Sequence, residues 1–275
     1  MAGKTRSRRG LGKQGSKLLT ILSASKKTVF ALKDAERALG GIGGPRLRKL
    51  LHDLAKGRWV ERIERGKYLI YPLEAGWKPD YGTHPFIIAR GLVEPYYVGF
   101  WSALNYYGIT EQGSRTTLIA TTKKKRPFPY KEEVYRFVSL PRKRFFGIRK
   151  EWMGESTFNI SDREKTVLDC LFLPKYGGGL TEVAKAFREK IDYGKLCAYA
   201  VKMDDLATLK RLGCLLDVLE IKTANAGKLL GRVSGGYCLL DAAGPKTGEK
   251  NAKWRVIENI PREELRRERG EHDKL

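Results

Sequence analysis

The chain has 275 residues, of which 41% are hydrophobic, so it is long enough for one large domain or two ordinary ones and is not a disordered protein. Its formal net charge is +23, and residues 1–80 carry 19 Lys or Arg against 7 Asp or Glu, a surplus of 12. This asymmetry indicates a polyanionic binding partner. Nucleic acid is the first candidate, because cations that neutralise phosphates release counterions and so strengthen binding. An acidic membrane surface is the competing interpretation. However, the sequence shows no signal-peptide core and no run approaching a membrane span, which favours a cytoplasmic protein without a membrane partner.

The first segment, residues 1–15, is rich in Gly, Ser and Arg and is expected to form a flexible basic arm. Within it, Arg6, Arg8 and Arg9 are candidates for contacts to a phosphate backbone or a minor groove. A solubilising tail would have the same composition, so both roles stay open.

Residues 16–80 are expected to fold as a winged helix-turn-helix domain. Helices are predicted at 16–22, 32–39 and 45–56, and the last is announced by two glycines and a proline at its first turn. Its apolar residues recur at helical spacing and form one stripe: Leu47, Leu50, Leu51 and Leu54. Strand-like runs at 59–63 and 68–71 surround Arg65 and Gly66 and predict a hairpin, the wing.

The cations of the third helix and of the wing are the candidate DNA contacts. At about 100° per residue, Lys49, His52 and Lys56 point away from the apolar stripe, and Arg46, Arg48 and Asp53 lie on its flanks. A helix of this kind fits the major groove, which is wide enough to admit it. The expected contacts are Arg46, Arg48, Lys49, His52 and Lys56 of the helix and Arg62, Arg65 and Lys67 of the wing.

A linker around Trp77 places the domain boundary near residue 80, and residues 81–260 are expected to form a larger mixed α+β domain. Strands are predicted at 116–121, 134–140, 145–149, 157–160, 237–241 and 254–257. Helices are predicted at 85–90, 100–107, 167–172, 180–187, 196–203 and 209–219. Residues 261–275 are almost all charged and are expected to be a solvated helix or a frayed tail. The predicted fold class is therefore α+β, with an N-terminal winged helix-turn-helix domain.

Catalytic and metal-binding patterns are mostly absent from the sequence. The histidines His52, His84 and His272 lack metal-ligand spacing, and the cysteines are too far apart for a zinc site, so free thiols are expected. Ser161 and Glu164 have the spacing of a capping box at a helix start, which explains this carboxylate better than nuclease chemistry does. We therefore predict no catalytic residue, no bound metal and no cofactor.

Two weaker patterns leave alternatives open. Asp205, Glu220 and Lys222 match the loose spacing of a metal-dependent nuclease, which would require these three side chains to converge around a metal ion. A basic run between two predicted strands is either a solvated loop or a second contact to a nucleic acid backbone or an acidic partner. This run consists of Lys123, Lys124, Lys125 and Arg126.

Several segments together resemble the AbiEi family, the antitoxin and autorepressor of AbiE-type (type IV) toxin-antitoxin systems. They are residues 96–109, 160–169 with the glycine loop 177–179, 211–216, and 240–248 leading to Trp254. The resemblance implies a winged helix that binds repeats upstream of its own operon and an α+β domain that counters a nucleotidyltransferase-like toxin. The basic arm and the charged tail depart from the family pattern.

We therefore expect a non-enzymatic transcriptional regulator whose partners are double-stranded DNA and a nucleotidyltransferase-like toxin. Two alternatives remain: a metal-dependent nuclease, and a free-standing DNA- or RNA-binding protein that has no toxin partner.

Overall fold

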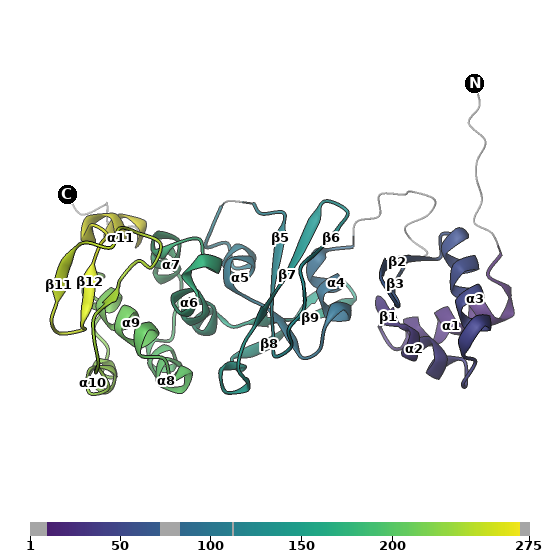
Figure 1. Ribbon diagram of the computed structural model, residues 1–275, viewed down its shortest axis with the longest axis horizontal. Coiled ribbons are helices and arrows are strands. Elements are labelled where there is room, and N and C mark those ends of the chain that lie inside the picture. Colours follow the sequence, from purple (N-terminus) through teal and green to yellow (C-terminus); the bar gives the residue numbers. More distant parts are fainter. Residues whose placement is uncertain (1–9, 72–82, 112, 270–275) are drawn as a thin grey trace, which may run out of the picture. The chain divides into compact units, whose positions relative to one another are not determined.

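The computed structural model describes residues 10–71, 83–111 and 113–269 (Figure 1). These residues form two compact units. Unit 1 contains the described residues up to Tyr96 together with Glu151–Phe158. Unit 2 contains the described residues within Tyr97–Lys150 and Asn159–Leu275. Helices combine with strands in three sheets, so the predicted α+β class is confirmed. The expected boundary near residue 80 and the expected arm contacts Arg6, Arg8 and Arg9 lie outside the described residues.

Unit 1 begins with three helices and a three-stranded sheet. The elements are α1 (Gly12–Ala24), β1 (Val29–Ala31), α2 (Leu32–Ala38), α3 (Gly44–Lys56), β2 (Val60–Glu64) and β3 (Lys67–Ile70). Strand β3 is central and pairs antiparallel with both β1 and β2. Helices lie at the three predicted places, but β1 was not predicted, because three residues are too few to show alternation.

Helix α1 starts earlier than expected. The arm was predicted to extend to residue 15, and this is wrong for its last residues, because the helix begins at Gly12. Gly15 is buried, and a Cβ at this position would lie 2.9 Å from Leu54 Cδ2 of α3. The glycine therefore permits a close approach of α1 to α3.

One apolar stripe from each helix forms the core of unit 1. Leu18 and Leu22 of α1 and Leu47, Leu51 and Leu54 of α3 are buried in one cluster. The partly buried Leu50 packs against the edge of this cluster. The leucine spacing that predicted α3 thus places three of its four leucines in the interior.

Helix α4 (Pro85–Leu92) was predicted as part of the second domain, but by its contacts it belongs to unit 1. Its N-cap is His84, whose Nδ1 accepts a hydrogen bond from the backbone N–H of Phe86 at 3.2 Å. Burial lowers the pKa of His84, which favours the neutral ring that this acceptor role requires.

The largest sheet has six strands in the order β6-β7-β5-β4-β9-β8. The strands are β4 (Tyr96–Val98), β5 (Thr116–Thr121), β6 (Phe128–Tyr130), β7 (Glu133–Ser139), β8 (Ile148–Met153) and β9 (Ser156–Ser161). β5 and β7 are parallel along their length, with Thr116 opposite Val134. The strand predicted at 145–149 is largely wrong, because β8 starts only at Ile148, after Gly147 with a φ of +68°.

Helices of unit 2 enclose a large core beside a small three-stranded sheet. They are α5 (Phe100–Tyr106), α6 (Arg163–Phe172), α7 (Leu180–Lys185), α8 (Tyr193–Met203), α9 (Leu206–Val218), α10 (Ala226–Leu230) and α11 (Arg262–Arg269), with 3-10 turns at Arg142–Arg144, Pro174–Tyr176 and Ala186–Arg188. The small sheet has the order β10-β12-β11, with β10 (Cys238–Leu239), β11 (Glu249–Asn251) and β12 (Val256–Glu258). Trp254 is buried against Gly213 of α9, where a Cβ would lie 2.2 Å from the indole ring.

The charged C-terminal segment contains a packed helix. Leu265 of α11 is fully buried, and α11 packs against α7, as Figure 1 shows. Glu268 lies 3.7 Å from the Lys185 ammonium and 3.8 Å from the Arg188 guanidinium. The expected helix is present as α11, but the expectation that it is solvated on all sides is wrong, because Leu265 is buried. A single leucine among charges shows no periodicity in the sequence, although it is enough to dock a short helix.

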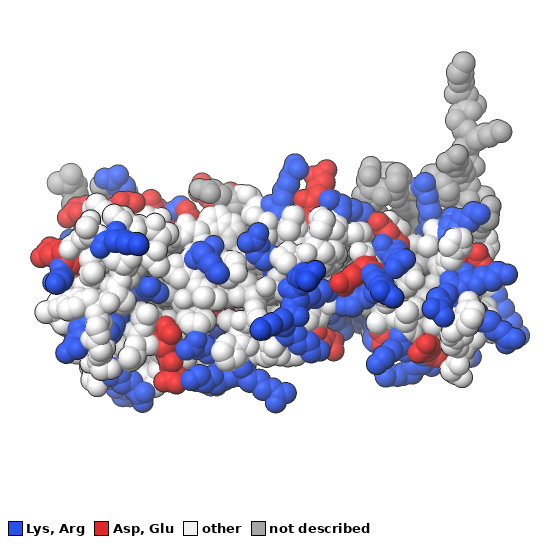
Figure 2. All heavy atoms as spheres, in the orientation of Figure 1, with Lys and Arg blue, Asp and Glu red and all other residues white. Residues whose placement is uncertain are grey.

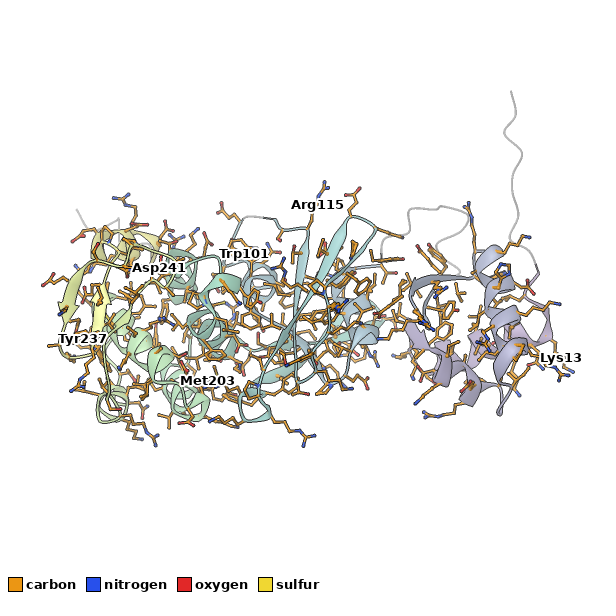
Figure 3. The ribbon with its side chains drawn as sticks, viewed as in Figure 1. Lys13, Trp101, Arg115, Met203, Tyr237 and Asp241 are labelled. Atoms are coloured by element: carbon orange, nitrogen blue, oxygen red, sulfur yellow. The ribbon has the colours of Figure 1, made fainter. Side chains whose placement is uncertain are left out.

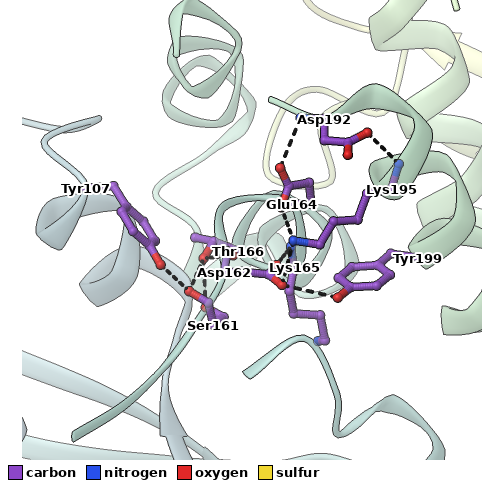
Figure 4. A network of polar contacts seen from close by, with 9 residues as sticks. All are labelled: Tyr107, Ser161, Asp162, Glu164, Lys165, Thr166, Asp192, Lys195 and Tyr199. Atoms are coloured by element: carbon purple, nitrogen blue, oxygen red, sulfur yellow. Dashed lines mark hydrogen bonds and ion pairs between the residues drawn. The ribbon is translucent and has the colours of Figure 1, made fainter. Parts of the chain in front are cut away.

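Helix α6 begins with a different cap from the one predicted. Asp162 is the N-cap, and its carboxylate accepts the backbone N–H of Lys165 at 2.8 Å (Figure 4). The predicted capping box is wrong, because Ser161 ends β9 and its hydroxyl lies 2.7 Å from that of Thr166. Glu164 instead joins α6 to the start of α8. Its carboxylate accepts hydrogen bonds from the backbone N–H of Asp192 at 3.0 Å and from the ammonium of Lys195 at 2.8 Å.

A fully buried polar triad lies one turn further along α6. The Tyr97 hydroxyl donates to Asp169 Oδ2 at 2.8 Å, and the Lys165 ammonium pairs with Asp169 Oδ1 and donates to the Tyr97 hydroxyl at 3.2 Å. All three side chains are 0% exposed. Residues 160–169, which carried part of the family resemblance, therefore hold together β4, β9, α6 and α8 from inside unit 2.

The cysteines are free thiols, as predicted: Cys170, Cys197 and Cys214 are buried and Cys238 is partly buried. Among the described helices, none has the length and apolar character needed to cross a membrane.

Candidate nucleic-acid interface

Helix α3 presents a cationic face to solvent. Lys49, His52 and Lys56 are exposed opposite its buried leucines, and Arg46 and Arg48 are exposed on the flanks of that stripe. No carboxylate of the described residues forms an ion pair with any of the Arg or Lys side chains in this group. The basic side chains predicted on the outer face of α3 are thus accessible together on one helix, and we call them the α3 cationic face.

His52 differs from its neighbours because it lies beside Asp53, the acidic residue of α3. The distance from His52 Nδ1 to Asp53 Oδ1 is 3.6 Å, and the two side chains are 75% and 59% exposed. A contact this exposed contributes little to stability. The His52 side chain therefore remains accessible on the α3 cationic face.

The hairpin of β2 and β3 is short and tied down at its turn. Leu32 donates its backbone N–H to the Gly66 carbonyl at 3.0 Å, and β1 pairs with β3 as far as Ala31 opposite Lys67. Arg62 and Arg65 are exposed, and both belong to the predicted contact set. The β2–β3 turn thus presents Arg65 to solvent from an anchored backbone.

Lys67 is placed apart from the other predicted contacts. Its ammonium donates to the backbone carbonyl of Leu92 and lies 3.6 Å from Glu64, and its side chain is 23% exposed. This arrangement assigns Lys67 a role in joining β3 to the end of α4. The sequence could not distinguish it from Arg65, because both are basic residues beside the same turn.

The start of α2 is held by Asp34. Its Oδ2 accepts the backbone N–H of Ala31 at 2.9 Å, and its Oδ1 pairs with the Lys27 ammonium. Burial alone would raise the pKa of Asp34, but the hydrogen bonds from Lys27 and Ala31 outweigh it and hold the pKa below its ordinary value. Asp34 is therefore ionised at neutral pH and fixes α2, whose buried Ala35 packs in the same cluster as the α3 leucines.

Two cations of α1 extend the basic surface of unit 1. Lys13 and Lys17 are exposed one helical turn apart, and Lys13 is labelled in Figure 3. In the view of Figure 2, blue Lys and Arg side chains predominate around α1 and α3. Lys13 was missed because the helix was predicted to begin at residue 16, and Lys17 within that predicted helix was not singled out. The signal that would have found them is the position of both lysines opposite Gly15, Leu18 and Leu22.

The basic run between β5 and β6 belongs to unit 2. Lys123, Lys124 and Arg126 are exposed. The ammonium of Lys125 instead lies over two aromatic rings, 5.3 Å from the centroid of Phe128 and 4.7 Å from that of Phe137. Three of the four residues are therefore accessible, while Lys125 makes cation–π contacts that attach the loop to the sheet.

The residues of the nuclease alternative do not converge. Asp205 caps the start of α9 and accepts the backbone N–H of Thr208 at 2.9 Å, whereas Glu220 follows the other end and pairs with Arg266 at 2.7 Å. A helix rises about 1.5 Å per residue, so the two carboxylates lie on the order of 20 Å apart. Within the described residues, no three His, Cys, Asp or Glu side chains are grouped so that they could hold a metal ion. The metal site proposed for Asp205, Glu220 and Lys222 is therefore overturned.

Comparison with known proteins identifies a shared fold. No protein-family model and no curated protein matches the chain. Among solved structures, the chain is similar to the crystal structure of the RV2827C protein from Mycobacterium tuberculosis, with a TM-score of 0.60 and 12% sequence identity. The match covers 97% of this chain and 98% of that chain. At this identity the similarity concerns the fold alone, and it extends along nearly the whole length of both chains.

Proposed function

We propose that this chain is a DNA-binding transcriptional regulator that acts in the cytoplasm, in which α1 to β3 work as a winged helix-turn-helix. The observation that carries the proposal is the α3 cationic face. This helix of 13 residues has three of its four leucines buried and presents Arg46, Arg48, Lys49, His52 and Lys56 to solvent. Within the described residues, no carboxylate forms an ion pair with its Arg or Lys side chains. Such a helix has the width and charge that the major groove accepts.

The charge of the segment from α1 to β3 supports the same proposal. Residues 10–71 contain 14 Lys or Arg and 5 Asp or Glu. Several of these acidic groups are already satisfied inside the unit, as in the pair of Asp34 with Lys27 and the contact of Glu64 with Lys67. The exposed charge is therefore mainly positive and suited to phosphate contacts, which position a protein on the duplex without reading its sequence.

The test uses the full-length chain and a duplex from the region upstream of its own gene. Changing both Lys49 and Lys56 to Ala should lower duplex affinity about tenfold or more and reduce the slope of log affinity against log salt by about 2, since each lost phosphate contact removes about one counterion. Fluorescence anisotropy titrations at several salt concentrations measure both quantities. Lys228→Ala, at an exposed position on α10 of unit 2, is the matched control and should bind as the parent does.

The same titration distinguishes this proposal from the RNA-binding alternative. Duplex RNA has a deep, narrow major groove that side chains cannot read. Duplex RNA should therefore compete poorly with duplex DNA. Equal competition, or an unchanged salt slope in the double variant, would contradict major-groove binding by α3.

On the resemblance to the AbiEi family, we further propose that the chain represses its own operon and counters a nucleotidyltransferase-like toxin through unit 2. The two activities should then be separable. The Lys49→Ala and Lys56→Ala double variant should lose repression and still relieve growth arrest. Leu104→Asp should do the reverse, because Leu104 of α5 is fully buried in the core of unit 2 and a charge there has no partner.

A reporter fused to the operon promoter and growth during co-expression with the neighbouring toxin measure the two activities separately. Loss of growth rescue in the Lys49 and Lys56 variant would show that the chain acts only as a repressor of its neighbour, and the antitoxin role would be abandoned.

A further inference from the structure

Unit 2 contains an open groove with a volume of about 360 Å³. It lies between α5, the face of β5 and β7, and the loop after α6. Its lining includes Trp101, Thr116, Leu118, Arg136, Lys175 and Tyr176. The volume falls within the range of small-molecule sites, and the described residues that line the groove include no acidic side chain.

The charge of the groove comes from two exposed cations. Arg136 projects from β7, where it pairs with Leu118 of β5, and Lys175 belongs to the turn Pro174–Tyr176. Within the described part of the chain, neither side chain forms an ion pair with a carboxylate. Two cations that share a groove without an acidic partner favour an anionic ligand.

Two aromatic side chains, Trp101 and Tyr176, line the same groove. Trp101 extends from α5 (Figure 3), and its indole ring meets Gly178, whose φ is +78° and where a Cβ would lie 1.9 Å from the ring. The close approach of this glycine fixes the position of the ring. The Tyr176 ring is also held, by an edge contact to Phe100 at 5.5 Å, and carries the Lys175 ammonium 4.9 Å from its centroid. Trp101 is partly buried and lines the groove, so it is the aromatic side chain that we assign to stacking.

We propose that this groove binds a nucleoside phosphate, with the base against Trp101 and the phosphate between Arg136 and Lys175. Cations alone would accept any anion, but a fixed indole beside the apolar Leu118 favours a flat, partly apolar group attached to that anion. A base with its phosphate has this combination, whether it is a free nucleotide or part of a single strand. The site lies in unit 2 and does not depend on DNA binding by α3.

The experiment is isothermal titration calorimetry on the full-length chain carrying Lys49→Ala and Lys56→Ala, so that the α3 cationic face does not contribute. The probes are ADP, GDP, CDP and UDP, with inorganic pyrophosphate as the probe of matched charge that lacks a base. At least one nucleoside diphosphate should bind about tenfold more tightly than pyrophosphate, because stacking on the indole adds to the phosphate contacts. A short single-stranded oligonucleotide as competitor shows whether the ligand belongs to a strand or is free.

Three further changes assign the binding to the groove. Arg136→Gln should weaken nucleotide binding about tenfold or more, because it removes a charged hydrogen-bond donor. Trp101→Leu should weaken binding of the nucleotides and leave that of pyrophosphate unchanged, and its thermal unfolding midpoint shows whether unit 2 is intact. Lys228→Gln, an exposed cation of α10 outside the groove, should have no effect.

Equal affinity for pyrophosphate and all four nucleotides would overturn the base contact with Trp101. No binding at millimolar concentrations would overturn the proposal as a whole, as would binding that Arg136→Gln and Lys175→Gln leave unchanged. Arg136 is exposed, so its substitution tests the site without disturbing the core.

Discussion

Replacing Lys165 by Met is expected to lower the stability of unit 2 by about 3–5 kcal/mol, the cost of removing one partner of a buried ion pair. The Lys165 side chain is 0% exposed, and its ammonium contacts both Asp169 Oδ1 and the Tyr97 hydroxyl. Without it, the Asp169 carboxylate would stay buried, with the Tyr97 hydroxyl as its hydrogen-bond donor. Urea unfolding, with amide hydrogen exchange in α6 to locate the effect, measures the loss.

The loss should depend on pH in a defined direction. Burial raises the pKa of Asp169 above its ordinary value of 3.8. Among the groups that lower this pKa, the Lys165 ammonium has the largest effect. In the Met variant the folded-state pKa should rise further above the unfolded value. An acid with a raised folded-state pKa destabilises the fold progressively as pH rises through that pKa, so the loss should be larger at neutral than at mildly acidic pH.

A double variant separates the buried charge from the loss of packing. Lys165→Met combined with Asp169→Leu should recover most of the lost stability, because replacing both charges by apolar groups removes the uncompensated one. If the double variant is no more stable than the single one, the ion pair is not the cause of the effect.

Leu51→Ala is expected to destabilise unit 1 by about 2–5 kcal/mol, because it leaves a cavity behind α3. Leu51 is 0% exposed and lies in one cluster with Leu18 and Leu47. DNA binding should fall in proportion to the unfolded fraction, since the α3 cationic face exists only on the folded helix. Urea unfolding and anisotropy titration on the same preparation measure the two losses together.

The neighbouring Leu50 supplies the matched control. It is the same residue type on the same helix, but it is only partly buried, so Leu50→Ala should cost clearly less. Lys49→Ala should change stability by less than about 0.5 kcal/mol, as an exposed substitution usually does. Equal losses for Leu51→Ala and Leu50→Ala would contradict the assignment of Leu51 to the centre of the core.

Elements with a long periodic pattern were predicted well. Helix α3 was expected at 45–56 and runs over Gly44–Lys56, and β5 lies at Thr116–Thr121 as predicted. In both, many residues repeat one spacing, so the pattern is visible along the chain alone. The short elements β1, β6, β11 and α10 were not predicted, because three to five residues contain too few repeats to define a period.

Individual side-chain roles were predicted less well. Ser161 and Glu164 had the spacing of a capping box, but Glu164 is used by Asp192 and Lys195 of another helix, and Asp162 makes the cap. Lys67 had the same local sequence signal as Arg65, but the end of α4 accepts its ammonium. In each case the competing partner is distant in the sequence and adjacent only after folding.

The sequence by itself determined the α+β class, the buried stripe of α3 and its cationic outer face, because these follow from local spacing and charge along one helix. Only the tertiary structure decided that the Lys67 ammonium contacts the Leu92 carbonyl, that Leu265 docks α11, and that Trp101 and Arg136 line one groove. These outcomes depend on contacts between residues far apart in the chain. Such contacts are determined by the packing of whole elements and leave no periodic signal in the sequence.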